Sequence, residues 1–466
     1  MVADKVLLLV GDSLRADSFK RYAPLGDDYK ELVPAYTQTP GATFSLLYGR
    51  HLSQVYWPTE LNPLEVLRAF NVNPDWPATS TFGMFNFIPL VARILKGESV
   101  VHALRKKGIK TMVYSQLNSP PLSLPDFDVT DLPDVRATLH KLDPINRALL
   151  KLILRFSQHV FKNSQINMSF MVTNFLLDTI PWREWIISNL GNFYSRHLYE
   201  DLANVALRKL KKLEGRWFVY FHAFTPHGEY SCGRYRHAVW LHSFLWNFNS
   251  MLAEHYKISQ VSNLEELKER PELCEKVKDL FEREVFGQLK GAYEECAKTF
   301  ADFVKRVKEE LVPEGWKVLV TSDHPEYFGE ECLSGHPPLP PTKEPPLKVP
   351  LALFGEGDLK DVKSYVQIPE LVAKNFTADW EAPIKDDVLV SIPYLHKEGW
   401  GILVEVTDGK EVAYHAVDER GNEVWEGPEH LREKIKEHER AASSERRKII
   451  FRIRTGIKVR KRVLHK

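Results

Sequence analysis

Cysteine and long apolar runs are scarce in this sequence. Its 466 residues include four cysteines, none in a CxxC pair, which indicates neither a disulfide framework nor a structural zinc site. The N-terminal apolar run stops at Asp12 and is too short for a signal-peptide core or a bilayer span. We therefore expect the chain to begin with a core strand and to work in the cytoplasm.

The net charge of the chain is also small. There are 63 Lys and Arg residues against 62 Asp and Glu, a net charge of +1, which argues against a whole-protein preference for nucleic acid. Hydrophobic residues make up 44% and charged residues 27%, an ordinary composition for a soluble globular protein. A chain of this length can bury a large core and divide into two or three domains or subdomains.

Strand and helix patterns alternate along most of the chain. Continuous apolar runs predict buried strands in the segments 5–10, 216–230, 317–324 and 348–357. A helical pattern followed by a strand occurs at 98–116, and a helix predicted over 293–311 precedes the run at 317. This alternation predicts an α/β fold with a mostly parallel sheet sandwiched by helices.

Changes in composition divide the chain into regions. Residues 1–380 form the expected main domain, in which 120–200 is an insertion made of a Pro- and Asp-rich loop and apolar helices. These helices either cap the sheet or dock at a membrane, and their charged residues exclude a bilayer span. Residues 381–430 alternate polar and apolar, with turns at Asp408-Gly409 and Gly421-Asn422, which predicts a small antiparallel β subdomain. Residues 431–466 form a basic helical tail.

Three of the predicted strands end in side chains that can bind a metal ion, namely Asp12, His227 and the pair Asp323-His324. One Asp in such a place commonly starts a turn. Several of them are expected to converge, because open α/β sheets gather their ligands at the carboxyl ends of the strands. Carboxylates with an imidazole suit one divalent ion, Mn²⁺ or Zn²⁺, whereas Ca²⁺ or Mg²⁺ would need an oxygen-richer site.

A candidate nucleophile lies in the segment TQTPGATFSLLYGR, residues 37–50. Pro40 at the first helical position makes Thr39 the expected N-cap, and Gly49 stands just past the helix end. Such a hydroxyl either ties down free helix amides or sits where an anion binds at the helix start. Three neighbouring hydroxyls cap the helix less naturally and compete for this role: Thr37, Thr43 and Ser45.

The order of these motifs resembles the sulfatase branch of the alkaline phosphatase superfamily. The segments that carry the resemblance are VLLLVGDSLRAD, TPGATFSLLYGR, FVYFHAFTPHGEY, VLVTSDHPEYFGE, SGH and KVPLALFG. It covers residues 5–375 apart from the 120–200 insertion, and the C-terminal hairpins look like that family's small C-terminal sheet. The resemblance implies that residues 1–380 are a sulfatase-like catalytic domain.

The resemblance also implies a set of site residues. Thr39 matches the nucleophile, which contacts the metal, and the other metal ligands match Asp12, Asp323 and His324. We therefore expect one divalent ion at these four residues. His227 and His336 match histidines that contact the substrate, or a second metal in two-metal members, and that second site stays open. His222 matches a histidine whose role varies.

Several positions depart from the family's pattern. Sulfatases have a Cys or Ser for conversion to formylglycine, and Thr39 cannot be converted. It resembles the nucleophile of members that act on phosphorus: phosphodiesterases, phosphonate ester hydrolases and phosphoryl-group transferases. Thr225 stands where many relatives have an Asp that binds a second metal, and Gly11 where sulfatases have a paired acid. Prolines replace the usual glycines at Pro325 and Pro337.

The expected function is therefore a metal-dependent hydrolase or transferase of phosphate or phosphonate esters, with a covalent Thr39 intermediate. One alternative is a sulfuric ester hydrolase that uses the unmodified Thr. Another is a degenerate member that binds an anion without turnover. The expected substrate is a small, or lipid- or glycan-linked, anionic ester.

Two arginines lie near the expected site, and each has a structural interpretation. Arg50 either assists with charge or is a solvated cation at a helix end. Arg15 and Asp17 form an expected local structural pair.

The basic tail allows three interpretations. From Arg446 onward there are ten Lys and Arg residues and no acid, and Ile449, Ile453 and Ile457 follow helical spacing. The segment is a solvated, partly disordered tail, a dock for an anionic membrane such as the inner membrane face, or a nucleic-acid binder. The near-neutral charge of the whole chain makes nucleic acid the least favoured.

Overall fold

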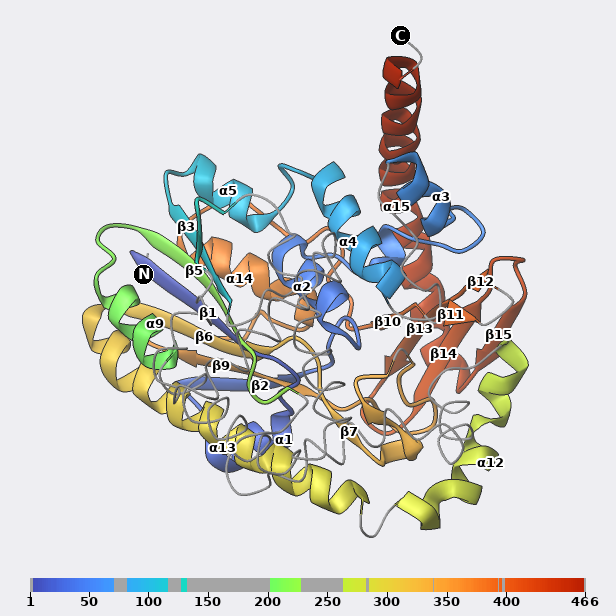
Figure 1. Ribbon diagram of the computed structural model, residues 1–466, viewed down its shortest axis with the longest axis horizontal. Helices are drawn as coiled ribbons and strands as arrows, with labels where there is room; N and C mark the ends of the chain where they lie inside the picture. The colour runs from blue at the N-terminus through green and yellow to red at the C-terminus, as the bar shows by residue number, and fades with distance from the viewer. Residues whose placement is uncertain are drawn as a thin grey trace, which may run out of the picture.

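The computed structural model describes residues 3–70, 82–115, 127–131, 202–227, 263–281, 285–337, 339–392, 394–395 and 399–464. At its centre lies a seven-stranded sheet in the order β2-β9-β6-β1-β5-β3-β4 (Figure 1). Its strands are β1 (Lys5–Gly11), β2 (Asp28–Leu32), β3 (Lys110–Ser115), β4 (Val129–Asp131), β5 (Trp217–Ala223), β6 (Trp316–Ser322) and β9 (Val349–Phe354).

The prediction of an α/β fold with a mostly parallel sheet is confirmed. β1 pairs in parallel with both β5 and β6, and β3 pairs in parallel with β5 and β4. The edge formed by β9 and β2 is antiparallel. The sequence did not predict β2 because its residues, DYKEL, contain no apolar run and are mostly half-buried.

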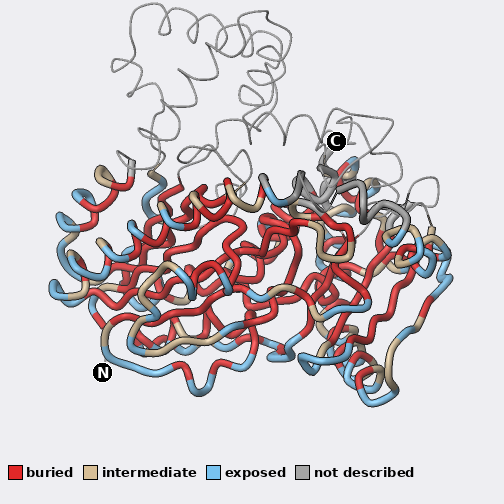
Figure 2. Tube along the Cα trace, turned by 90° about the horizontal axis from the view of Figure 1, so that it is seen from below, coloured by how far each residue is buried: buried red, intermediate tan, exposed pale blue. Residues whose placement is uncertain are grey.

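Helices cover both faces of this sheet (Figure 1). Alternate residues of the central strands enter two separate apolar cores. One core packs against α2 (Thr39–Tyr48), α3 (Pro63–Ala69), α4 (Phe82–Ile94), α5 (Val100–Lys106) and α14 (Ile368–Asn375). The other packs against α1 (Ala16–Tyr22), α9 (Leu202–Lys211) and α13 (Val285–Leu311). Figure 2 shows the buried residues as a continuous interior with exposed segments around it.

A second sheet follows near residue 389, as the hairpin pattern predicts. It is antiparallel in the order β10-β13-β14-β15. Its strands are β10 (Leu389–Ser391), β13 (Ile402–Thr407), β14 (Val412–Val417) and β15 (Glu423–Glu426). Gly409 and Gly421 turn two of its hairpins with positive φ angles of 91° and 84°, which glycine adopts without strain.

The remaining elements are short, except for two long helices. The short ones are η1 (Leu52–Gln54), η5 (Val312–Glu314), η6 (Glu330–Cys332), η7 (Tyr365–Gln367), β7 (Tyr327–Phe328), β8 (Ser334–Gly335), β11 (Tyr394–Leu395) and β12 (Gly399–Trp400). The long ones are α12 (Leu264–Phe281) and α15 (Glu429–Leu464). None of the described helices is long and apolar enough to cross a membrane.

Part of the predicted insertion over 120–200 lies in the described residues. The loop predicted there contains the short strand β4, which extends the main sheet beside β3. The apolar helices predicted for that insertion lie outside the described residues.

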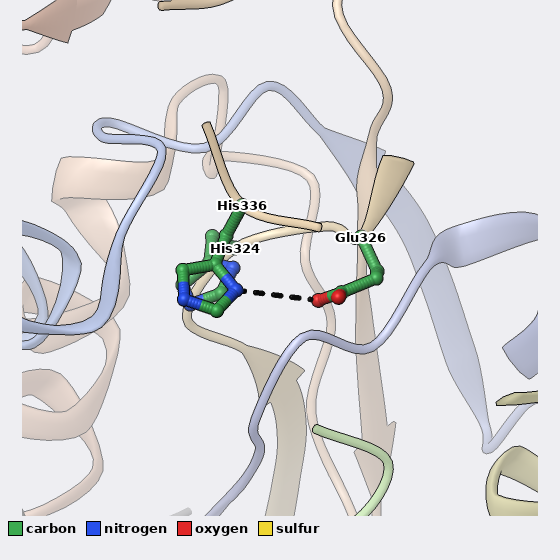
Figure 3. Close-up of side chains that lie close together, drawn as sticks. All are labelled: His324, Glu326 and His336. Carbon is green, nitrogen blue, oxygen red and sulfur yellow. Dashed lines mark ion pairs between the residues drawn. The ribbon is translucent and has the colours of Figure 1, made fainter. Parts of the chain in front are cut away.

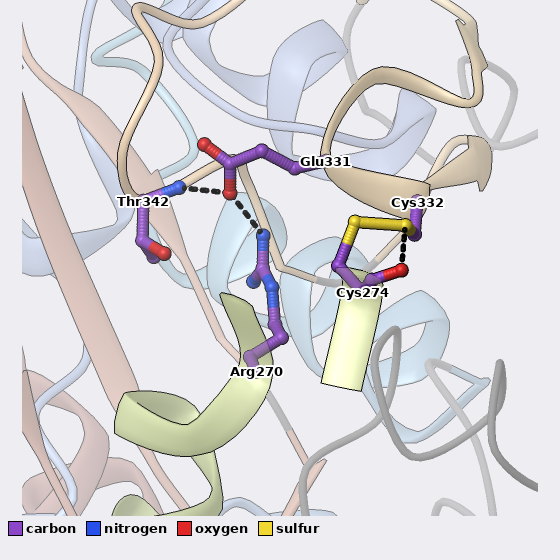
Figure 4. Close-up of a disulfide and its surroundings, with 5 residues drawn as sticks. All are labelled: Arg270, Cys274, Glu331, Cys332 and Thr342. Carbon is purple, nitrogen blue, oxygen red and sulfur yellow. Dashed lines mark hydrogen bonds and ion pairs between the residues drawn. A yellow bond between two sulfur atoms is a disulfide. The ribbon is translucent and has the colours of Figure 1, made fainter. Parts of the chain in front are cut away.

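The structure contains a disulfide that the cysteine spacing did not indicate. Cys274 of α12 and Cys332 of η6 are 58 residues apart and form a disulfide (Figure 4). Sequence spacing gave no signal for this pair, because two distant elements bring it together. Disulfides persist mainly in oxidising compartments and in proteins of hyperthermophiles, so a cytoplasmic location stays a prediction.

Next to this bridge, a buried ion pair joins the same two segments. Arg270 of α12 donates to Glu331 Oε2 at 3.1 Å, and the Glu331 carboxylate also accepts the backbone N–H groups of Thr342, Lys343 and Glu344 (Figure 4). The segment that follows β6 is therefore tied to α12 in two ways.

The disulfide should contribute measurably to stability. Closing a loop of 58 residues lowers the entropy of the unfolded chain, so the Cys274→Ser, Cys332→Ser double variant should lose about 4 kcal/mol of unfolding free energy. Urea unfolding followed by circular dichroism measures this. An unchanged midpoint would contradict a formed bridge.

Two glycines in helices should respond oppositely to alanine. A Cβ at Gly41 of α2 would lie 2.2 Å from the buried Tyr36 ring, so Gly41→Ala should cost about 1–3 kcal/mol by overpacking. Gly287 of α13 has open space, so Gly287→Ala should gain about 0.5–1 kcal/mol from helix propensity. Thermal unfolding of both variants tests the packing of α2, and equal shifts would show that Tyr36 does not press on Gly41.

Candidate active site

The central strands end in register, and this places the site. Gly11 at the end of β1 lies opposite Ala223 of β5 and Ser322 of β6. Asp12, Asp323 and His324 follow directly, all buried, with ligand atoms within 4.8 Å of one another. The structure therefore brings together three of the four residues that the strand ends singled out, and His227 lies in an adjoining group.

The imidazole of His324 is close to every member of this cluster. Its Nε2 lies 3.5 Å from Asp323 Oδ2 and 3.6 Å from Asp12 Oδ1. Its Nδ1 lies 3.1 Å from the carbonyl oxygen of Pro325, which can only accept, so Nδ1 carries the proton and Nε2 offers a lone pair. Pro325, which departs from the family pattern, therefore orients a candidate ligand through its carbonyl group.

His222 joins the same cluster from β5. Its Nε2 lies 3.5 Å from Asp323 Oδ2 and 3.8 Å from Asp12 Oδ2, and the side chain is fully buried. His222 has no definite role in the sequence analysis, because a histidine inside a buried strand has no pattern that marks it as a ligand. Its position one residue before the strand end was the available signal.

Backbone and side-chain hydrogen bonds hold the cluster in place. The N–H of Ser13 donates to Asp323 Oδ1 at 3.0 Å, which ties the loop after β1 to the loop after β6. Ser322 Oγ lies 2.7 Å from the Gly11 carbonyl and accepts from the N–H of Leu14 at 2.7 Å. These bonds make the positions of the two carboxylates depend on each other.

Their neighbours make the two buried carboxyl groups differ in pKa. Burial itself, and then the charges of Asp323 and Glu326, raises the pKa of Asp12 well above its usual value. Burial also opposes ionisation of Asp323, but the His324 and His222 imidazoles outweigh it and hold the pKa of Asp323 below its usual value.

This cluster fits a divalent ion. Asp323 Oδ2 and both ring nitrogens of His222 are buried and form no hydrogen bond within the described residues. Two carboxylates, imidazole nitrogen and a hydroxyl suit Mn²⁺ or Zn²⁺. The residues that would hold the ion are Asp12, Asp323, His324 and Thr39, with His222 as a further candidate.

Thr39 lies at the start of α2 and faces the cluster. Its Oγ1 is 3.1 Å from His324 Nε2. The prediction that Thr39 is the N-cap is wrong by one residue: Gln38 is the N-cap and forms no side-chain cap bond, and Thr39 is the first helical residue. Gly49 does end the helix, in the left-handed conformation with φ 58°. The Thr39 hydroxyl is thus directed at a histidine of the cluster.

Of the three competing hydroxyls, one is engaged in structural hydrogen bonds and two are buried without a partner among the described residues. Ser45 Oγ lies 3.0 Å and 2.7 Å from the carbonyls of Gly41 and Arg50, which makes it part of the helix end. Thr43 is fully buried within α2. Thr37 is buried as well, and its Oγ1 has no hydrogen-bond partner among the described residues.

A second group of side chains adjoins the first (Figure 3). His324, Glu326 and His336 place ligand atoms within 4.8 Å of one another. His336 Nδ1 lies 3.5 Å from Glu326 Oε2, and the His336 ring centroid is 4.9 Å from that of His227. The two histidines carried over from the resemblance therefore lie side by side at the site.

Glu326 is a site residue that the sequence analysis missed. It is fully buried, two residues after His324, in a segment without strand or helix periodicity. Burial opposes protonation of His336, but the Glu326 carboxylate outweighs it and raises the pKa of His336. Burial, followed by the neighbouring His336, lowers the pKa of His227 to about 3.

The structure shows the surroundings of Thr225 and Gly11, two positions that depart from the family pattern. Thr225 is buried near the end of β5 and supplies no carboxylate, whereas Glu326 brings one to the same group of histidines. A Cβ at Gly11 would lie 3.0 Å from the Phe300 ring, so the paired acid of sulfatases has little room here.

The two arginines are structural. Arg50 is not a solvated cation: it is 6% exposed, and its Nη2 lies 2.7 Å from Glu98 and 3.7 Å from Glu445. Arg15 pairs with Asp17 at 3.0 Å, as expected, and also with Glu330 at 2.7 Å.

Metal binding should stabilise the protein. After treatment with a chelator, adding Mn²⁺ should raise the melting temperature by several degrees, because an ion that binds only the folded chain stabilises it by mass action. Asp323→Asn should abolish most of this rise, whereas Asp302→Asn on the exposed face of α13 should keep it. Differential scanning calorimetry measures both, and an equal rise in Asp323→Asn would place the ion elsewhere.

No family model matches this chain, and no curated protein is similar in sequence. Solved structures do share its fold. The phosphonate monoester hydrolase of Agrobacterium radiobacter superposes with a TM-score of 0.51 at 12% identity, over 91% of this chain and 89% of that one. A 2-O GAG sulfatase superposes with a TM-score of 0.50 at 10% identity, over 95% of this chain and 91% of that one. At such identities the likeness concerns the fold.

Proposed function

We propose that this chain, which has the fold of the sulfatase-like alkaline phosphatase superfamily, is a metal-dependent hydrolase of phosphate or phosphonate esters. The single observation that carries the proposal is the position of Thr39. Its hydroxyl lies 3.1 Å from His324 Nε2, beside a buried cluster fit for a divalent ion. A nucleophile in that place explains why the site gathers carboxylates and imidazoles in the protein interior.

The proposed reaction would use both a metal ion and side chains of the protein. A divalent ion, when bound, lowers the pKa of a neighbouring hydroxyl and polarises a phosphoryl oxygen. Asp12, Asp323, His324 and Thr39 would hold it.

Thr39 then forms the covalent intermediate. Its Oγ1 attacks phosphorus in line, so a bond to Thr39 forms as the bond to the leaving oxygen breaks. The N–H groups in the first turn of α2 favour the anionic ester, because helix amides and the dipole attract negative charge there.

The leaving group needs a proton, and two histidines are placed to supply it. His336 and His227 lie side by side next to His324, with ring centroids 4.9 Å apart. His336 is the better donor to the leaving oxygen, because Glu326 raises its pKa, whereas burial lowers the pKa of His227. Water then releases the phosphoryl group from Thr39, or an acceptor alcohol does so in a transferase.

Our preference for phosphorus esters over sulfate esters as substrates rests on the identity of the nucleophile. The two structural neighbours are a phosphonate monoester hydrolase and a sulfatase, so the fold alone favours neither ester class. A sulfuric ester hydrolase would have to work with an unmodified threonine, and so we favour phosphorus esters. A binding-only protein would not need a hydroxyl beside the ligand cluster. The proposal names a class of substrate and no single compound. It also leaves a second ion at Glu326 and His336 open.

Replacing the nucleophile should abolish turnover. With Mn²⁺ present, nitrophenyl phosphate, phosphodiester, phosphonate and sulfate esters are offered to the wild type, Thr39→Ala and Thr39→Ser. Thr39→Ala should lose at least about 10³-fold in kcat on the phosphorus ester that is turned over, and Thr39→Ser should keep part of it. The released nitrophenol is followed by absorbance.

Each other outcome has a clear meaning. Full activity in Thr39→Ala would refute the nucleophile. Turnover of the sulfate ester alone would favour the sulfuric ester hydrolase, and metal binding without any turnover would favour the anion-binding alternative.

A further inference from the structure

The C-terminal helix α15 has two distinct sides in its last turns. Ile449, Ile450 and Ile453 are buried in the main core, and Ile457 packs against it. The opposite side consists of exposed residues three or four positions apart. We call this side the basic face; its residues are Arg447, Lys448, Phe451, Arg452, Arg454 and Lys458.

The isoleucine stripe is therefore not available to a membrane. Arg446 holds the helix through Glu60 at 2.9 Å and the Ser53 carbonyl at 2.7 Å, and His438 Nε2 lies 2.7 Å from Ser53 Oγ. The helix cannot roll to expose its isoleucines without losing these contacts. The interpretation of the segment as a disordered tail is also wrong, because α15 continues to Leu464.

Charge is strongly divided between this segment and the rest of the chain. Residues 446–466 contribute +10. Since the whole chain carries +1, the preceding 445 residues carry 1 − 10 = −9. An anionic surface would thus attract the end of α15 and repel the remainder, which orients the molecule.

The basic face also displays an aromatic side chain. Phe451 is 71% exposed, whereas the other exposed large hydrophobic residues of the described chain, Leu25 and Val129, are 38% and 39% exposed. Lys448 and Arg452 have acidic neighbours in Glu445 and Glu98, but Arg447 and Lys458 form no ion pair with any described residue. Figure 1 shows that the end of α15 projects beyond the other described helices and strands.

We propose that the basic face docks the protein on an anionic lipid bilayer. Phe451 enters the headgroup region, where aromatic rings settle, and the surrounding cations contact the lipid phosphates. The exposed ring favours a bilayer over nucleic acid, whose backbone calls for cations alone. This inference does not depend on the proposed reaction.

Co-sedimentation of the full chain with vesicles tests the proposal. The wild type should sediment with vesicles containing phosphatidylglycerol, stay in solution with phosphatidylcholine alone, and be released by high salt. Arg447→Ser with Lys458→Ser should weaken binding about thirtyfold, taking roughly a fivefold contribution for each cation. Phe451→Ser should weaken it as well.

A matched pair of substitutions controls for charge alone. Lys212→Ser with Lys305→Ser removes two exposed cations at the ends of α9 and α13, away from α15, and should leave binding unchanged. Equal losses in the two double variants would overturn the proposal, as would a wild type that does not sediment at low salt. Fluorescence anisotropy with duplex DNA completes the test: tight DNA binding that requires Arg447 and Lys458, without vesicle binding, would assign the face to nucleic acid. Unchanged melting temperatures confirm that each variant is folded.

Discussion

The register of three strands is the constraint on which the site depends. Because Gly11, Ala223 and Ser322 lie side by side, the residues that follow β1 and β6 reach one point in the protein interior. A one-residue slip of either strand would turn Asp12 or Asp323 to the other face of the sheet. The two apolar cores therefore specify the site indirectly, since they fix the register through the burial of alternate residues.

Much of the fold could be predicted because its signals are local. A continuous apolar run marks a central strand wherever it occurs, and Asp12 and Asp323 stand out as the polar residues that end such runs. Thr39 was found through the helix signals around it, although the helix begins one residue earlier than Pro40 suggested. The edge strand β2 was not predicted, because a half-buried strand needs no apolar run.

What could not be predicted depends on contacts between distant segments. Glu326 and His222 have no periodic pattern of their own, and their relation to the site follows from where the neighbouring strands end. The disulfide between Cys274 and Cys332 joins elements 58 residues apart, and no spacing rule covers it. Arg50 resembled a solvated cation from its place at a helix end, but α15 packs over it and supplies Glu445.

The pairing of β1 with β6 has a consequence for biosynthesis. The two strands are held by contacts such as Ser322 to Gly11, which are 311 residues apart in the chain. At about 5–20 residues per second, the ribosome needs roughly 15–60 s to make the partner of a strand that it has already released. The apolar segment VLLLV has neither strand neighbour until β5 has been made, and it lacks one of them until β6 has been made. Folding of the central sheet is therefore a late event in translation, and the exposed segment can bind a chaperone before the candidate metal site forms.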